Sequence, residues 1–310
     1  MGFNRVKFSF ELLETQALHS GLSNRLRKEH ALPQLGHINY VNSLPIILPI
    51  TTGRVRLEAK IHLGTPTELN QGYASGKLDI GAMSASFYLE RNDLTIFPNI
   101  SISGQKAVGS VLFFSKSDLA HSHRLKIAVP RASATSVNLL TILFLEEAIP
   151  MPLFVVKDNP DLTSEDIDGA LVIGDRALSV DEEWSKIAER IDLGSWWYKT
   201  FRLPAVFGLW AARSSWARAN TYRFLEISNA LTLARQTGIT TAFAEVLEEA
   251  KARLGLSTER LEKYYCEELD FSFNVAHQMA LSKYGDLCQR YGLLNNALPL
   301  EQSPSQPATI

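Results

Sequence analysis

The chain has 310 residues, of which 45% are hydrophobic, 9% aromatic and 21% charged. This composition is typical of a folded globular protein and excludes a largely disordered or fibrous chain. The 31 Lys and Arg residues are balanced by 33 Asp and Glu residues, so the chain lacks the basic excess that is typical of nucleic-acid binding. At roughly 150 residues per domain, the length predicts two domains or one domain with two lobes.

No segment has the sequence of a membrane anchor. The longest wholly apolar run, Leu203–Ala212, is well short of the roughly 20 residues that a membrane helix needs. Near the N-terminus, Glu11 and Glu14 interrupt the apolar stretch that a signal peptide would require. We therefore expect a cytoplasmic protein with no membrane contact, an N-terminal extension over residues 1–33 and a disordered tail over residues 299–310.

Strands and helices alternate in the first part of the chain. Gln34–Tyr40 has the alternation of a strand and runs into a polar loop. A second strand is expected over Arg56–Leu63, and Thr65–Glu68 then has the residue order of a capping box at the start of a helix. Gly76 is predicted to end that helix, and Leu78–Ser84 to form the next strand. The order strand, helix, strand predicts a parallel sheet whose loops gather at one edge, where small-molecule sites form.

A second α/β series follows, and the last third of the chain is expected to be helical. The expected elements are strands Val108–Ser115, Lys126–Val129, Leu153–Val156, Ala170–Ile173 and Leu203–Arg213, and helices Ser133–Ala148, Trp216–Gln236, Thr241–Leu254 and Val275–Tyr291. We predict an α/β protein in which the second lobe is inserted into the first. The first lobe would comprise residues 34–116 and 205–298, and the second residues 117–204.

Most motifs of nucleotide and metal chemistry are absent. The chain has no Gly-x-Gly-x-x-Gly, phosphate loop, His-Glu-x-x-His, Cys-x-x-Cys or Gly-x-Ser-x-Gly, so we expect no nucleotide chemistry and no metal. His121 and His123 have a spacing that metals can use, but they stand in a polar turn and are expected in a solvated loop. Cys266 and Cys288 are too few for a disulfide framework and are expected as reduced thiols.

Hydroxyl and amide side chains stand where the expected strands end or helices begin. They are Asn42, Ser43, Thr65, Ser84, Ser110, Ser133, Thr135 and Ser136. The helix that begins at Ser133 has no acidic residue in its first turns, so its positive N-terminus is open to a carboxylate or a phosphate. Simple N-capping is the alternative for its three hydroxyls, and for Asn42 the alternative is a residue that satisfies its own turn.

Several other polar and aromatic residues have more than one interpretation. His37 lies on a strand that looks buried, and we expect a core histidine rather than a catalyst. Asp175 follows the end of a strand and could orient a site residue or cap the next helix. Trp196, Trp197 and Trp210 are expected in the core and at the interface between the lobes.

Ordered blocks of the sequence carry a resemblance to a known family. The blocks are Gly36–Pro45, Gly64–Leu69, Leu78–Gly81 with Ser84, Ser110–Leu112, Ser133–Val137, Ile173–Asp175 and Leu203–Arg213. They resemble the chorismate dehydratase branch of the menaquinone biosynthesis proteins of the futalosine pathway. The resemblance implies a fold similar to a type II periplasmic binding protein, with a ligand cleft between two α/β lobes. It also implies dehydration of chorismate, a small dicarboxylate, to 3-[(1-carboxyvinyl)oxy]benzoate without a cofactor.

The resemblance also implies roles for individual residues. Asn42 matches the family's functional asparagine and is expected to be catalytic. The residues expected to bind substrate are Ser43, Thr65, Ser84, Ser110, Ser133, Thr135, Ser136 and Asp175. Because the matched blocks hold no well-placed Glu or Lys base, we hypothesise that the enolpyruvyl carboxylate of the substrate removes the ring proton. The enzyme would fix the reactive conformer and stabilise developing negative charge.

The chain departs from the usual pattern of the family at four places, and other functions stay open. The departures are at Ala85, Phe87, Lys106 and Phe201, and side chains around a cleft control which substrate is accepted. One alternative is a non-catalytic binding protein for a small aromatic or carboxylate ligand, because fold does not determine function. Another is a lyase of the sister branch that acts on a larger futalosine-derived substrate. The block around Asn42 favours the dehydratase branch.

Overall fold

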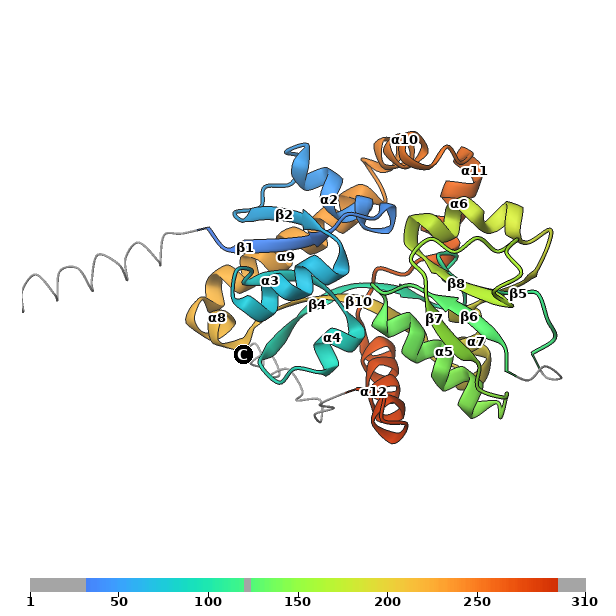
Figure 1. Cartoon of the computed structure of the whole chain (residues 1–310). Coiled ribbons are helices and arrows are strands. Elements are labelled where there is room, and N and C mark those ends of the chain that lie inside the picture. The colour runs from blue at the N-terminus through green and yellow to red at the C-terminus, as the bar shows by residue number, and fades with distance from the viewer. Residues whose placement is uncertain (1–31, 120–123, 295–310) are drawn as a thin grey trace, which may run out of the picture.

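The computed structural model describes residues 32–119 and 124–294 (Figure 1). The predicted extension over residues 1–33, apart from its last two residues, lies outside this part of the chain. The predicted tail over residues 299–310 and the turn with His121 and His123 also lie outside it.

Two five-stranded sheets form the framework of the molecule, one in each lobe (Figure 1). The first sheet has the order β2-β1-β3-β10-β4. Its strands are β1 (Gln34–Ile38), β2 (Lys60–Gly64), β3 (Ile80–Ser84), β4 (Leu94–Gly104) and β10 (Ala205–Arg213). Strand β1 pairs in parallel with β2 and β3, whereas β10 is antiparallel to both of its neighbours. The predicted parallel pairing at the start of the chain is therefore confirmed.

The second sheet has the order β7-β6-β8-β5-β9. Its strands are β5 (Val111–Ser115), β6 (Lys126–Val129), β7 (Leu153–Val156), β8 (Gly169–Ile173) and β9 (Glu189–Asp192). Strand β6 pairs in parallel with β7 and β8, while β5 is antiparallel to β8 and β9. Both sheets thus place parallel strands beside strands that return in the opposite direction.

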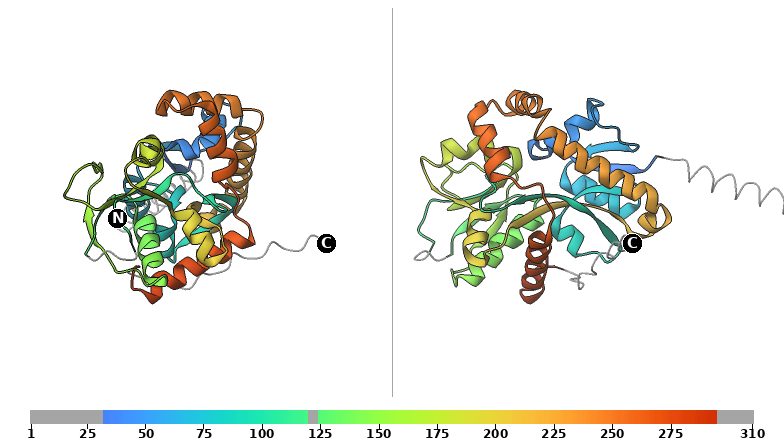
Figure 2. Two further views of the ribbon diagram at one scale, coloured as in Figure 1. Left: turned by 90° about the vertical axis from the view of Figure 1, so that its right-hand side faces the viewer. Right: turned by 180° about the vertical axis from the view of Figure 1, so that it is seen from behind.

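Helices cover the faces of both sheets and fill the junction between them. In the first lobe they are the 3-10 turn η1 (Val41–Ser43), α2 (Leu44–Thr51), α3 (Pro66–Ser75), α4 (Ala85–Leu89), α8 (Ser214–Ala219) and α9 (Thr221–Gly238). In the second lobe they are α5 (Ala134–Glu146), α6 (Gly174–Trp184) and α7 (Leu193–Phe201). The C-terminal segment adds α10 (Phe243–Leu254), α11 (Thr258–Lys263), the π-helical turn η2 (Tyr264–Glu268) and α12 (Val275–Arg290). Figure 2 shows α9 running across the back of the first lobe.

The point at which the chain enters the second sheet differs from the expectation. Strand β5 pairs with β8 and β9, so the crossing lies before Val111 and not near Ser115. The expected strand over Val108–Ser115 is shorter because a side chain binds the backbone at its start. The carboxylate of Asp192 accepts hydrogen bonds from the N–H groups of Val108 and Gly109 at 2.7 to 3.2 Å. The chain returns to the first sheet between α7 and β10.

The predicted capping residues at both ends of α3 are confirmed. Thr65 caps α3, because its Oγ1 accepts the N–H of Glu68 at 3.3 Å. The Glu68 carboxylate accepts the N–H of Thr65 at 2.8 Å in return, which completes the capping box. Gly76 ends the helix with a φ of 80°, a backbone conformation that glycine adopts without steric cost.

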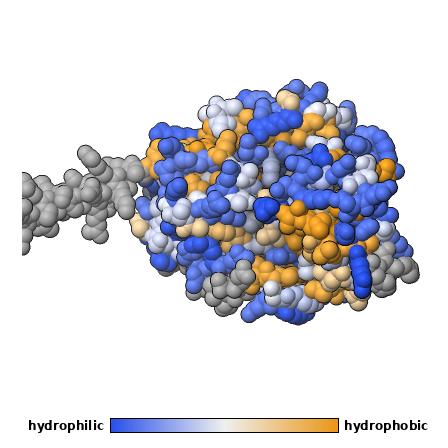
Figure 3. All heavy atoms as spheres, viewed as in Figure 1, coloured by the Kyte–Doolittle hydropathy of each residue, from blue (hydrophilic) through white to orange (hydrophobic). Residues whose placement is uncertain are grey.

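A hydrophobic core extends through both lobes. Trp197 and Trp210 are buried in it, and Trp196 packs against it, as expected. Cys288 is buried and Cys266 is exposed, and both are free thiols. Figure 3 shows hydrophilic residues over most of the visible face, with a hydrophobic area over the second lobe. Within the described residues, no helix has the length and hydrophobicity needed to cross a membrane.

Candidate functional site

A cavity lies between the two sheets, where the ends of strands and the starts of helices meet. The cavity and the solvent space at its open mouth together amount to about 740 Å³ free of protein atoms. Its polar lining residues are Tyr40, Asn42, Ser43, Ser84, Ser110, Ser133, Thr135 and Ser136. Its apolar walls include Ile38, Ala82, Ile102, Ile173, Phe207 and Trp210. The cavity therefore has the mixture of apolar walls and a few convergent polar groups that is typical of a small-molecule site.

Most of the predicted site residues come together in this cavity, and two lie beside it. Thr65 and Asp175 are absent from its lining, although their neighbours Pro66 and Gly174 take part. The hydroxyl of Thr65 is engaged in the capping box, where it donates to Glu68 at 2.9 Å. Thr65 is exposed and therefore acts at the start of α3 rather than inside the cavity.

Asn42 stands on η1, between β1 and α2, and lines the cavity. Within the described part of the chain, its side-chain amide has no hydrogen-bond partner, so the amide does not satisfy its own turn. The neighbouring Ser43 does this instead. Its buried Oγ lies 2.7 Å from the carbonyl oxygen of Ile38 and 2.8 Å from that of Tyr40. The amide of Asn42 is thereby left available to a ligand.

His37 supports this turn from the core. Its Nε2 lies 3.0 Å from Oγ of Ser43, and its ring is almost completely buried. Burial lowers the pKa of His37 to about 3, because a charged imidazolium is disfavoured away from water. His37 is therefore a neutral, hydrogen-bonded core histidine, as expected.

The N-terminus of α5 opens into the cavity. No side chain caps this helix, and its first turn holds no acidic residue. The capping alternative for its hydroxyls is thus wrong, because Oγ of Ser133 donates to Oγ of Ser136 at 2.8 Å instead. The Thr135 hydroxyl accepts the N–H of Ser86 at 3.0 Å. The N–H groups of the first helical turn are left without intrahelical acceptors, so the positive end of the helix faces the cavity.

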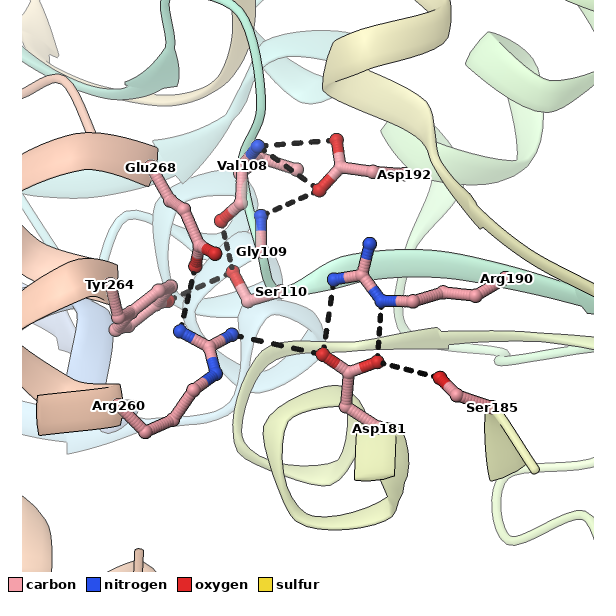
Figure 4. Close-up of polar contacts among 10 residues, drawn as sticks. All are labelled: Val108, Gly109, Ser110, Asp181, Ser185, Arg190, Asp192, Arg260, Tyr264 and Glu268. Carbon is pink, nitrogen blue, oxygen red and sulfur yellow. Dashed lines mark hydrogen bonds and ion pairs between the residues drawn. The ribbon is translucent and has the colours of Figure 1, made fainter. Parts of the chain in front are cut away.

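Ser110 is held where the chain crosses between the lobes (Figure 4). The phenol of Tyr264 donates a hydrogen bond to Oγ of Ser110 at 2.8 Å. Burial raises the pKa of Tyr264, so its hydroxyl stays protonated and serves as the donor. The bonds from Val108 and Gly109 to Asp192 fix the backbone just before Ser110.

Charged side chains gather behind this crossing. Arg260 pairs with Glu268 at 2.9 Å and lies 3.8 Å from Asp181. Asp181 is also bound by Arg190, at 2.5 and 3.0 Å (Figure 4). None of these four residues lines the cavity. The four residues link α11 and η2 to the second lobe. The cluster therefore contributes no ionised side chain to the cavity.

The cavity lining itself carries no Asp, Glu, His, Lys or Arg among the described residues. Tyr40 supplies its one titratable side chain there, and burial together with the nearby Asp175 charge raises the pKa of that phenol. Tyr40 lies in the same connection as Asn42, and no sequence motif marks it as a site residue. In the part of the chain that the structure describes, no three His, Cys, Asp or Glu residues are grouped to hold a metal.

Asp175 acts on the turn that carries Asn42. Its Oδ1 accepts the backbone N–H of Val41 at 2.9 Å. Of the two alternatives for Asp175, the structure therefore favours the one that orients a site residue, since no side chain caps α6. Burial raises the pKa of Asp175, while the Val41 N–H and the charge of Arg253 act in the opposite direction.

The four departures from the family pattern lie outside the cavity lining. Ala85, Phe87, Lys106 and Phe201 are all absent from it. Phe87 packs with its ring centroid 6.1 Å from that of Tyr73, and the Phe201 ring packs on Trp197 at 4.4 Å. Phe87 and Phe201 therefore contribute to the packing around the site, and none of the four departures alters the residues of its lining.

Comparison with known proteins places the chain in a family. A family model described as menaquinone biosynthesis matches residues 33–290. The chain belongs to this menaquinone biosynthesis family. A curated relative of this menaquinone biosynthesis protein is the chorismate dehydratase of Thermus thermophilus. The two are 32% identical over 226 residues, which cover 68% of this chain and 80% of the relative.

Solved structures confirm the expected two-lobed fold. The protein AF1704 from Archaeoglobus fulgidus has a TM-score of 0.66 at 20% identity, covering 84% of this chain and 98% of its own. The alkanesulfonate-binding protein SsuA from Xanthomonas axonopodis pv. citri has a TM-score of 0.63 at 13% identity, covering 86% and 96%. The periplasmic aliphatic sulphonate binding protein SsuA from Escherichia coli has a TM-score of 0.62 at 13% identity, covering 90% and 96%. This menaquinone biosynthesis protein thus has the periplasmic-binding-protein fold.

Proposed function

We propose that this protein is a chorismate dehydratase that converts chorismate to 3-[(1-carboxyvinyl)oxy]benzoate and water in menaquinone biosynthesis. Family membership and the chorismate dehydratase relative support this reaction. The observation that carries the mechanism is the lining of the cavity, which holds neutral hydroxyl and amide groups and no carboxylate, lysine or histidine among the described residues. The cytoplasmic location and the absence of a cofactor stay predictions.

The substrate is a dicarboxylate, and the site offers it neutral donors. One carboxylate would lie at the open N-terminus of α5, where backbone N–H groups and the helix dipole favour a negative charge. The hydroxyls of Ser133 and Ser136 stand beside these N–H groups and add donors of the right kind. This arrangement binds an anion without placing a competing lysine or arginine near the reacting ring.

The reaction needs a base and a route for the leaving hydroxyl. A ring C–H bond breaks, its electron pair completes the aromatic ring, and the neighbouring C–O bond breaks to release the hydroxyl. With no carboxylate, lysine or histidine in the described cavity lining, the enolpyruvyl carboxylate of the substrate takes the proton. That proton and the departing hydroxyl together make the water that is lost.

The protein's part is to hold the substrate in the conformer in which its own carboxylate reaches the ring proton. The amide of Asn42, which has no partner within the described residues, is the group available to fix this conformer and to stabilise developing negative charge. Its position after the end of β1 places it in the same cavity as the open end of α5.

The experiment is to incubate the purified protein with chorismate, without added metal or nucleotide, and to follow products by chromatography and mass spectrometry. We expect the enolpyruvyl benzoate, one water lighter than chorismate, and none of it in an enzyme-free control. Bound but unchanged chorismate would instead support a binding protein. Turnover of a futalosine-derived compound and not of chorismate would support the sister-branch lyase.

A further inference from the structure

The residue before Asn42 is held by two side chains from distant parts of the chain. The N–H of Val41 donates to Oδ1 of Asp175 at 2.9 Å, across 134 positions of sequence. The phenol of Tyr265 donates to the carbonyl oxygen of Val41 at 2.7 Å, across 224 positions. Asp175 lies in the first turn of α6 in the second lobe, and Tyr265 lies in η2.

These two bonds fix both peptide groups that lead into Asn42. The N–H of Val41 belongs to the peptide that joins it to Tyr40, and its carbonyl belongs to the peptide that joins it to Asn42. Val41 is completely buried, which leaves the backbone little freedom to rotate. The amide of Asn42 has no partner of its own among the described residues, so its position depends on the backbone beneath it.

The surroundings of Asp175 and Tyr265 favour their hydrogen bonds to the backbone of Val41. Asp175 is half-buried, and burying a carboxylate is costly unless a donor meets it. Tyr265 is buried, and burial raises its pKa, so its hydroxyl stays a donor. The charge of Arg253 also acts on Asp175. The Asp175 carboxyl group therefore accepts the Val41 N–H, and the protonated Tyr265 hydroxyl donates to the Val41 carbonyl oxygen.

The π-helical turn explains how one short segment reaches two loops of the cavity. Such turns carry an extra residue and occur frequently at functional sites. In η2, Tyr264 reaches Ser110 at the crossing between the lobes (Figure 4), while the next residue, Tyr265, reaches Val41. The segment thus joins the crossing to the turn that carries Asn42.

We propose that Asp175 and Tyr265 are positioning residues that set the Asn42 amide for the reaction by holding the two peptide groups of Val41. Asp175 and Asn42 belong to different lobes, so the bond to Val41 also couples the approach of the lobes to the placement of the amide. This inference rests on the proposed dehydratase function for its kinetic consequences. Neither residue lines the cavity, so neither is assigned a contact with the substrate.

The first test is a kinetic comparison of Asp175→Ala, Asp175→Asn and Tyr265→Phe. We expect Asp175→Ala and Tyr265→Phe to lower kcat by about tenfold or more, with KM changed by less than about threefold, because a misplaced group costs rate more than binding. Asp175→Asn should restore kcat to within about threefold of the wild type, because its amide oxygen can accept the same N–H.

Matched controls and a double variant separate positioning from general damage. Glu182→Ala, an exposed acid on the same helix, and Tyr222→Phe, an exposed tyrosine, should leave kcat unchanged. In an Asn42→Ala background, Asp175→Ala should lower kcat by less than about threefold, because its effect passes through Asn42. The proposal would be overturned if the fold-losses in kcat of the two single variants multiplied in the double variant, or if Asp175→Asn did not restore kcat.

A measurement that does not depend on catalytic activity tests the positioning role separately from the proposed function. Nuclear magnetic resonance reports hydrogen exchange at the Val41 amide and the chemical shifts of the Asn42 side-chain amide. Asp175→Ala should speed exchange at Val41 by about tenfold or more and move the Asn42 signals, while Asp175→Asn and Glu182→Ala should do neither. If the wild type is inactive on chorismate but Asp175→Ala still shows these spectral changes, the proposed dehydratase function is refuted and the positioning role is not. Unchanged spectra in Asp175→Ala would refute the positioning role whatever the activity.

Discussion

The backbone N–H of Ser86 donates a hydrogen bond of 3.0 Å to Oγ1 of Thr135, and so joins α4 of the first lobe to the first turn of α5 in the second. Both residues are buried. From α12, the Tyr284 hydroxyl lies 2.7 Å from Oγ of Ser86 and donates to the Thr135 carbonyl at 3.2 Å. The open end of α5 is thereby held against the first lobe through neutral hydrogen bonds. Thr135, although it lines the cavity, has a structural role that the sequence did not indicate.

Replacing Thr135 by valine should destabilise the protein by about 1–3 kcal/mol, because the buried N–H of Ser86 loses its acceptor. Thr135→Ser keeps the hydroxyl and should cost distinctly less. Urea unfolding of the two variants and the wild type measures the difference. A larger loss in Thr135→Ser than in Thr135→Val, which keeps the methyl group, would mean that the methyl group, and not the hydrogen bond, is what matters at this position.

Asn42→Ala should lower kcat on chorismate by about a hundredfold or more, the usual effect of losing a preorganised donor. The fold should stay intact, because the side chain has no hydrogen-bond partner among the described residues. Asn39→Ala is the control, since Asn39 lies in the same connection but outside the cavity lining. Its side chain contacts Arg253 at 3.1 Å, and its loss should change kcat by less than about threefold. Near-normal turnover in a folded Asn42→Ala would remove Asn42 from the mechanism.

Ser136→Asp should weaken chorismate binding by about tenfold or more, because a fixed carboxylate at the open end of α5 competes with that of the ligand. The asparagine of Ser136→Asn is nearly the same size as the aspartate of Ser136→Asp but carries no charge, so Ser136→Asn should weaken chorismate binding less. Titration calorimetry at low salt compares the two dissociation constants. If the two variants bind alike, the substrate carboxylate lies elsewhere in the cavity.

The protein should lose stability in mild acid through His37. Burial lowers the pKa of His37 to about 3 in the folded state, whereas a histidine in an unfolded chain titrates near ~6.5. Between these values the unfolded chain binds a proton that the folded chain does not, so the free energy of unfolding falls as the pH falls. Urea titrations at about pH 7 and about pH 5, on either side of the unfolded value, should show a smaller fall for His37→Gln than for the wild type. An identical fall would assign the acid sensitivity to other groups.

Local signals in the sequence were sufficient for much of the framework. The capping box of Thr65 and Glu68, the left-handed stop at Gly76 and strand β6 all lie where the residues predicted them. Such features depend on neighbours a few positions apart, which the sequence displays directly. Strand β4, which was not expected, shows the limit, because Pro98 and Asn99 interrupt its sequence pattern. The N–H groups of Ser101 and Ser103 in this strand donate to carbonyl oxygens of the distant segment after η2.

The sequence by itself determined the alternating α/β order, the open N-terminus of α5 and the Asn42 turn at the end of the first strand. Only the tertiary structure decided how Asn42 is held, because the bonds to Val41 come from Asp175 and Tyr265, 134 and 224 positions away. It also decided that the chain crosses between the sheets before Val111. Contacts of this separation depend on how the two lobes and the C-terminal helices pack, and no pattern of neighbouring residues encodes that packing.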